Sequence, residues 1–227
     1  MGLTSLHKSS IGKKAIVSIT GLMLLGFVVG HMVGNLQIFL GQEALNNYAE
    51  ALQSLGELLW VIRFVLLAVF VKHIVFALML ARENRAARPI GYAKQATREA
   101  SYASRFMVVT GILVLMHVIY HLAHFTLGSV HSQYYGFEDE LGRHDVYSMV
   151  VASFQDPAIA LTYIAAMAAL AFHLRQAASS FPQSIGIVQP ATLKKFRVGG
   201  LIFSIIIFIG YSSIPAAAML GILRMPE

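Results

Sequence analysis

Residues 15 to 40 read AIVSITGLMLLGFVVGHMVGNLQIFL, a stretch without Lys, Arg, Asp or Glu. A helix rises about 1.5 Å per residue and a hydrocarbon core needs roughly 20 apolar residues, so this segment is long enough to cross a membrane. It also contains His31, a residue that is costly to place in lipid. The stretch therefore predicts a membrane-spanning helix whose one ionisable group needs a partner or a ligand.

The rest of the chain has the same character. Only 12% of its 227 residues are charged, where a soluble domain carries about 25%, and 57% are apolar. So few charges cannot cover a soluble surface of this size. We expect an all-α polytopic membrane protein with five spans, the first four forming a bundle. The predicted spans cover residues 15–40, 58–81, 106–130, 157–178 and 198–223, with a short interfacial helix over 42–57 and a polar outer connection over 132–156.

Charge asymmetry predicts the orientation, because Lys and Arg are retained in short cytoplasmic loops. Two positive residues, Arg143 and Arg224, fall on the side that holds most of the acidic residues. We therefore expect the amino terminus in the cytoplasm and the carboxyl terminus outside. The net charge of +6 reflects this topology, and no nucleic-acid partner is expected. The twelve positive residues on the opposite, cytoplasmic side are Lys8, Lys13, Lys14, Arg82, Arg85, Arg88, Lys94, Arg98, Arg105, Lys194, Lys195 and Arg197.

Four of the nine histidines lie at matched depths. Each lies 16 or 17 positions after the charged residue at which its span begins, which is roughly 24–26 Å along a helix. Successive spans run in opposite directions, so two histidines fall in an outer layer and two in an inner layer, although the sequence shows no convincing internal repeat. The four pairs of entry residue and histidine are Lys14 and His31, Glu57 and His73, Arg105 and His121, and Asp156 and His173.

Paired histidines from different helices suit the axial ligation of haem iron. A histidine-rich zinc or copper site would need three or four ligands at one depth instead. The chain has no cysteine, which excludes iron–sulfur ligation and thiolate metal sites within it. Iron with both axial positions filled carries electrons and has no open site for substrate. We predict two haem b groups, one between His31 and His121 and the other between His73 and His173.

Small and basic residues near the two layers could complete these sites. Glycines leave room for a macrocycle, although close helix packing explains them equally well. Ser18 could donate to an inner propionate, and Lys72 and Arg175 could neutralise propionates or face lipid headgroups. The candidate haem contacts are Ser18, Gly30, Gly111, Lys72 and Arg175.

Two further histidines lie on the same predicted helix face as His121, because spacings of four and three residues return to one side of a helix. Either His117 or His124 could replace His121 if the span were shifted by a turn, but His121 best matches the depth of His31. We expect His124 near the outer surface, suited to a propionate or a quinone oxygen. His117 is expected to be a packing histidine.

Short motifs surround the four histidines in a fixed order. They are Ser18-Ile-Thr-Gly21 before Gly30-His31-Met32, Lys72-His73, Val109-Thr110-Gly111 before His121, and Asp156-Pro157-Ala158 leading through Tyr163 to Phe172-His173-Leu174. Together they resemble the dihaem cytochrome b anchor of succinate:quinone oxidoreductases, over essentially the whole chain. The similarity is to the single-chain, five-helix anchors of prokaryotic complex II and related fumarate reductases, which implies a prokaryotic cell membrane.

The resemblance implies a subunit of a larger enzyme. A flavoprotein with FAD and an iron–sulfur subunit would dock on the cytoplasmic side and oxidise succinate in the tricarboxylic acid cycle, while this chain has no dicarboxylate catalytic site. His31 and His121 would hold the distal haem, and His73 and His173 the proximal one. The basic loops over 82–105 and 194–197 would receive the iron–sulfur subunit, or contact lipid headgroups.

The electron acceptor implied by the resemblance is a quinone, menaquinone or ubiquinone. We place its site near the outer haem, where acidic and polar groups could handle protons. The candidate residues are Glu50, Gln53, Glu57, Tyr120 and His124.

Two other functions remain open at this point. One is the cytochrome b subunit of a hydrogenase or formate dehydrogenase, although one ligand on each of the first four spans favours the succinate family. The other is a transporter that uses histidines as a proton relay without haem. A relay needs closely spaced groups along one path, whereas these histidines fall into two layers.

Overall fold

The structure is a computed structural model that describes residues 9–87, 106–184 and 190–226. Within these ranges the chain is helical and forms no strand, with one isolated bridge between Glu138 and His144. Five helical segments are long and apolar enough to span a membrane, which confirms the predicted all-α polytopic class. They are Ser10–Leu40, Glu57–Ala86, Met107–Thr126, Pro157–Pro182 and Thr192–Met219.

The helices follow the predicted order but differ at their ends. The fifth begins well before residue 198, because a helix can extend past its apolar window into a basic segment that faces water. The third stops at a π-turn, after which Gly128 adopts a φ of 60°. The elements are α2 (Ser10–Asn35), the 3-10 helix η1 (Leu36–Leu40), α3 (Gln42–Gln53), α4 (Glu57–Ala86), α6 (Met107–His121), the π-turn η2 (Leu122–Thr126), the 3-10 turn η3 (Ser132–Tyr134), α7 (Val146–Gln155), α8 (Pro157–Ser184) and α9 (Pro190–Met219).

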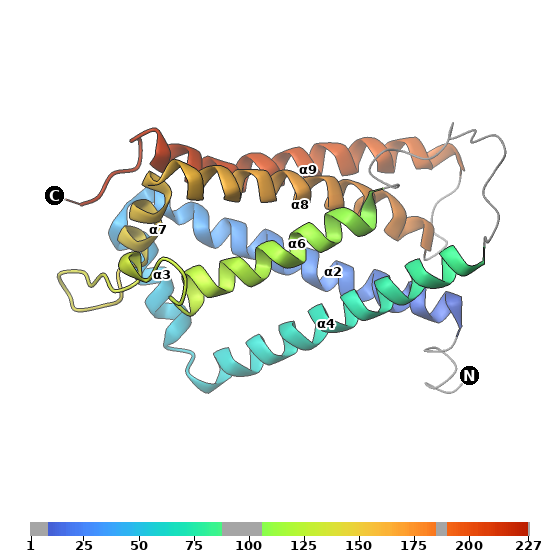
Figure 1. Cartoon of the computed structure of the whole chain (residues 1–227), viewed down its shortest axis with the longest axis horizontal. Coiled ribbons are helices and arrows are strands. Elements are labelled where there is room, and N and C mark those ends of the chain that lie inside the picture. The colour runs from blue at the N-terminus through green and yellow to red at the C-terminus, as the bar shows by residue number, and fades with distance from the viewer. Residues whose placement is uncertain (1–8, 88–105, 185–189, 227) are drawn as a thin grey trace.

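The five long helices lie side by side as an elongated bundle (Figure 1). α2 packs against α4, α6 packs against α8, and α8 packs against α9. α4 is the least enclosed of them, with Val69 as its one buried residue. The first four long helices therefore form two adjacent pairs, α2 with α4 and α6 with α8, and α9 covers α8.

One end of the bundle, which we name the cap end, holds α3, α7 and the carboxyl terminus. The largest apolar core lies here and is built from η1, α3, α7, α8 and α9. α7 corrects the expectation of a polar connection over 132–156, because residues from Tyr147 to Phe154 bury an apolar face and Val151 is fully enclosed. Asp145 begins this helix by accepting a hydrogen bond from the Ser148 backbone N–H. Core residues at the cap end include Ile38, Leu45, Val151, Ile159 and Ile214.

The opposite end, which we name the basic end, carries most of the described Lys and Arg residues. Lys13 is buried and pairs with Glu83, which joins α2 to α4. The separation of basic and acidic residues at opposite ends agrees with a sided membrane protein, whereas the orientation itself stays a prediction. Five of the twelve basic residues, Lys8, Arg88, Lys94, Arg98 and Arg105, lie outside the described residues.

Candidate functional site

The structure brings His31 and His121 together near the cap end. Their ring centroids lie 5.8 Å apart, with 83° between the ring planes. His31 comes from the last part of α2, and His121 is the final residue of α6 before the π-turn. Both rings are half-buried between helices. We name this pair the outer layer.

Aromatic rings and an amide surround the outer layer. Phe27 stacks on His31 at 5.3 Å, and the Asn35 side-chain nitrogen lies 3.2 Å from His31 Nε2. His121 contacts the rings of His117 and Tyr163 at 6.0 and 6.1 Å between centroids. The positions of these two imidazoles are therefore set mainly by packing.

His73 of α4 and His173 of α8 form an inner layer nearer the basic end. Each ring is held by a threonine from a neighbouring helix. Thr20 Oγ1 on α2 lies 3.2 Å from His73 Nδ1, and Thr110 Oγ1 on α6 lies 3.4 Å from His173 Nδ1. The two histidines therefore occupy equivalent environments in the two helix pairs.

The glycine after each threonine allows this approach. A Cβ atom added at Gly21 would lie 3.1 Å from His73 Cε1, and one added at Gly111 would lie 3.3 Å from His173 Cε1. Both distances are tighter than ordinary van der Waals contact, so a larger side chain would push the ring. Gly30 is different, since a Cβ there would meet nothing within 4 Å. Open space therefore adjoins α2 beside His31.

The threonines and glycines extend the regular placement of the histidines. Thr20-Gly21 precedes His31 with the same spacing as Thr110-Gly111 precedes His121. Nine residues separate glycine from histidine in both helices, but those nine residues share little identity. The repeat is therefore too short to recognise by sequence similarity, and its signal is the equal spacing of a few polar and small residues.

His124 has both ring nitrogens engaged. It is 2% exposed, with Nδ1 3.0 Å from the Tyr163 hydroxyl and Nε2 3.1 Å from Ser153 Oγ. Ser153 donates its hydrogen to the Met149 carbonyl at 2.7 Å. Its oxygen must therefore accept from His124 Nε2–H, and the Tyr163 hydroxyl must donate to Nδ1. A ligand could use His124 only by displacing one of these partners.

Tyr163 appeared in the sequence only as part of a motif with no role assigned, and Ser153 was not among the candidate residues. Tyr163 also packs edge-on against His117, with 4.9 Å between ring centroids. One tyrosine of α8 thus contacts His117 and His121 of α6 and His124 of η2. Tyrosine near the start of a span is common, and only the fold shows which rings it reaches.

The five candidate quinone residues fall into two groups. Glu50 is exposed and pairs with Arg143 at 3.2 Å, while Gln53 and Glu57 lie exposed at the corner between α3 and α4. Tyr120 lies in the bundle, with its hydroxyl 2.9 Å from His131 Nε2. It belongs with His124, since their ring centroids lie 5.8 Å apart.

The remaining candidate haem contacts are dispersed. Ser18 is half-buried on α2, and Lys72 is exposed on α4 beside His73. Arg175 lies two residues after His173, at an apolar groove of about 270 Å³ between α8 and α9. Ser204 also lines this groove. The groove lies between α8 and α9, so Arg175 suits a lipid-facing role as well as a propionate role.

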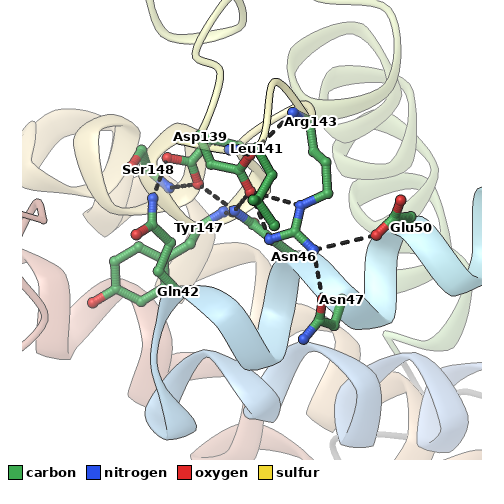
Figure 2. Close-up of polar contacts among 10 residues, drawn as sticks. Gln42, Asn46, Asn47, Glu50, Asp139, Leu141, Arg143, Tyr147 and Ser148 are labelled. Carbon is green, nitrogen blue, oxygen red and sulfur yellow. Dashed lines mark hydrogen bonds and ion pairs between the residues drawn. The ribbon is translucent and has the colours of Figure 1, made fainter.

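A polar network joins two segments of the cap end, α3 and the loop before α7 (Figure 2). Asn46 of α3 is 1% exposed and donates to Asp145 Oδ1 at 2.9 Å and to Asp139 Oδ2 at 3.2 Å. Its own oxygen accepts from the Tyr147 backbone N–H at 3.1 Å. Arg143 completes the network with an ion pair to Asp139 at 2.8 Å. These contacts fasten α3 to the loop before α7.

The two carboxylates of this network are stabilised in their charged form. Burial opposes ionisation of Asp139, but hydrogen bonds from the Arg143 side chain and backbone outweigh it and lower the pKa of Asp139 to about 2. Burial also opposes ionisation of Asp145, while hydrogen bonds from Ser148 and Asn46 hold the pKa of Asp145 below its usual value. Both groups are thus charged at neutral pH.

The bundle brings imidazoles from different helices together. His31 and His121 are in ring contact, His73 and His173 are held by equivalent threonines, and open space adjoins Gly30. Two imidazoles on one iron are the donor set that a haem b would use, so the residues present fit that group. Among the described residues, no group of three or more His, Cys, Asp or Glu is placed to hold a metal ion. No family model, curated protein or solved structure matches this chain. The functional argument therefore depends on the geometry of its own residues.

Proposed function

We propose that this protein is the membrane anchor and electron-transfer subunit of a succinate:quinone oxidoreductase. The observation that supports it most is the arrangement of four histidines from four helices as two pairs at two depths. A haem b held by each pair would supply a one-electron carrier in each half of the bundle. The protein then contributes ligands, orientation and a dry environment.

The chain's residues divide these tasks. Thr20 and Thr110 hold the inner rings, and Tyr163 packs against the outer ones. A neutral imidazole is the form that binds a metal, and apolar surroundings favour that form. Glu50, Gln53 and Glu57 offer water-exposed groups at the cap end for the protons that quinone reduction consumes, and Tyr120 offers a hydroxyl inside the bundle.

The basic end is the docking surface we propose for an iron–sulfur subunit that receives electrons from an FAD flavoprotein. Its described cations come from α2, α4 and α9 and gather at one end of the bundle. Such a surface attracts an acidic partner, and equally the headgroups of anionic lipids. The inner histidine layer lies nearer this end, which suits electron entry there and exit toward quinone at the cap end.

A histidine relay explains the geometry less well. His117 contacts His121, and His124 contacts His131, with the Tyr163 ring between the two pairs. Residues 111–116 of α6, between Thr110 and His117, are all apolar or glycine. A transmembrane proton path would have to cross this interval, whereas electron transfer between two layers does not require continuous polar groups.

The test is a haem count on the purified full chain by pyridine haemochrome and reduced-minus-oxidised spectra. We expect two b-type haems per chain. His31→Ala and His121→Ala should remove one haem, and His73→Ala and His173→Ala the other, while His144→Ala in the cap loop serves as the control. Absence of haem from the wild-type chain, or loss of different haems within one pair, overturns the proposal.

The partner subunits need a separate measurement. Purification of the tagged chain from its native membrane should bring down a flavoprotein and an iron–sulfur protein with succinate:quinone reductase activity. Recovery of a hydrogenase or formate dehydrogenase with the haem-containing chain would support the cytochrome b assignment. It would show that the partner enzyme is not a succinate:quinone oxidoreductase.

A further inference from the structure

The same contact between threonine and histidine occurs twice in the inner layer. Thr20 of α2 reaches His73 of α4, and Thr110 of α6 reaches His173 of α8, through Oγ1 and Nδ1 in both cases. Both threonines are buried, at 7% and 9% exposure. Repetition on two helix pairs, with a glycine after each threonine, argues for a shared requirement and against incidental packing.

Hydrogen counting determines the direction of each bond. Thr20 Oγ1 lies 2.7 Å from the Ile16 carbonyl of its own helix, and Thr110 Oγ1 lies 3.0 Å from the Met107 carbonyl. A hydroxyl has one hydrogen, and in both residues the backbone carbonyl takes it. The threonine oxygen can then only accept from the histidine, so Nδ1 of each imidazole carries the hydrogen.

Each threonine has a second carbonyl of its own helix within reach. Thr20 Oγ1 contacts the Val17 carbonyl at 3.2 Å, and Thr110 Oγ1 contacts the Phe106 carbonyl at 3.1 Å. A carbonyl accepts and cannot donate, so both contacts also draw the hydroxyl hydrogen toward the backbone and leave the threonine oxygen to accept from the histidine.

A neutral imidazole with its hydrogen on Nδ1 has its remaining lone pair on Nε2. Metal-binding histidines characteristically donate the other ring N–H to a fixed acceptor, which sets their tautomer, orientation and basicity. We propose that Thr20 and Thr110 are positioning residues that hold His73 and His173 with Nε2 available as an axial ligand. This inference rests on the proposed haem function and adds two residues that act through the ligands.

The outer layer lacks the same arrangement. Asn35 contacts Nε2 of His31, the atom that would bind iron in the corresponding tautomer, and so cannot serve as the equivalent of Thr20. The inference therefore makes an asymmetric prediction, since loss of a threonine hydroxyl affects one haem of the two.

The experiment compares Thr20→Val and Thr110→Val with Thr20→Ser and Thr110→Ser in the full chain. Haem content and the redox titration of each haem are measured in detergent. A donated N–H makes the ligand more basic and favours oxidised iron, so the valine variants should raise the midpoint potential of the inner haem and weaken its retention roughly 10–100-fold. The serine variants should restore both properties, because serine keeps the hydroxyl.

Thr162→Val is the matched control, since the Thr162 hydroxyl bonds the Ala158 carbonyl of its own helix on the exposed side of α8. Valine variants with an unchanged inner haem overturn the inference, as does an equal effect on both haems, which would indicate a general structural role. Absence of haem from the wild-type chain overturns the proposed function instead, so the two failures are distinguishable.

A measurement on the unaltered chain is independent of variant folding. Nitrogen-15 NMR of the histidine-labelled wild-type protein reports which ring nitrogen carries hydrogen. Nδ1–H at His73 and His173 supports the inference, whereas Nε2–H at either residue overturns it for that residue.

Discussion

The inner and outer histidine layers are built by different means. In the inner layer each histidine ring forms a hydrogen bond with a threonine hydroxyl of a neighbouring helix, and the same contact is made in both helix pairs. In the outer layer the rings pack among aromatic side chains, mainly Phe27 and Tyr163. The inner imidazoles are thus fixed in tautomer and rotation, whereas the outer ones are fixed in position. Variants that remove packing and variants that remove hydroxyls should therefore act on different layers.

The largest effect is expected from Tyr163→Ala. Removing a buried aromatic ring costs about 3–5 kcal/mol, and this ring contacts His117, His121 and His124. Unfolding in detergent should show that loss together with release of the outer haem before the inner one. Tyr163→Phe keeps the ring and leaves His124 Nδ1 without its donor, so it should cost about 1–3 kcal/mol. Release of the inner haem first would contradict the proposed difference between the layers.

A smaller effect is expected from overpacking the inner layer. Gly21→Val and Gly111→Val would press branched side chains against His73 and His173, at a cost of about 1–3 kcal/mol. Spectral titration with haem should show weaker binding at the inner layer and little change at the outer one. Gly199→Val is the control, because nothing lies within 4 Å of a Cβ there. Equal losses in all three variants would show that the close approach has no special importance.

Acidification should loosen the cap. The folded pKa of Asp139 is about 2, below an unfolded value of about 3.9. Its stabilising contribution is therefore complete above about pH 4 and is lost as the pH falls toward 2. Thermal unfolding from pH 7 to 2 should show this decline, and Asp139→Asn should flatten it. An unchanged decline in that variant would assign the effect to other groups.

The smallest effect is expected from Asn35→Leu. Its amide contacts the nitrogen of His31 that haem would use, so the contact is not part of ligand binding. We expect haem retention within about twofold of the wild type, a change of about 0.5 kcal/mol or less. A loss as large as that of Thr20→Val would show that Asn35 supports the outer ligand after all.

The sequence predicted the five spans because length and apolar content are local properties that a bilayer imposes. It also indicated two histidine layers, since depth follows from counting residues along a helix. It did not predict α7, because the apolar residues of this short helix lie within a stretch of sequence that is polar on both sides. Nor could it assign partners to His124, because Tyr163 and Ser153 reach that ring from two other helices. Counting residues along one helix gives the depth of a side chain in the membrane. It does not show which side chains of other helices that side chain contacts.

The weak enclosure of α4 has a consequence for how the protein is assembled. A helix with Val69 as its one buried residue gains little from packing against helices other than α2. Its position opposite α8 would then depend on the bond that His73 makes through a shared cofactor. During biogenesis, insertion of that cofactor would come after the spans have entered the membrane and would complete the tertiary structure. Cells short of haem should accumulate a chain whose second span is cleaved by proteases sooner than its fourth.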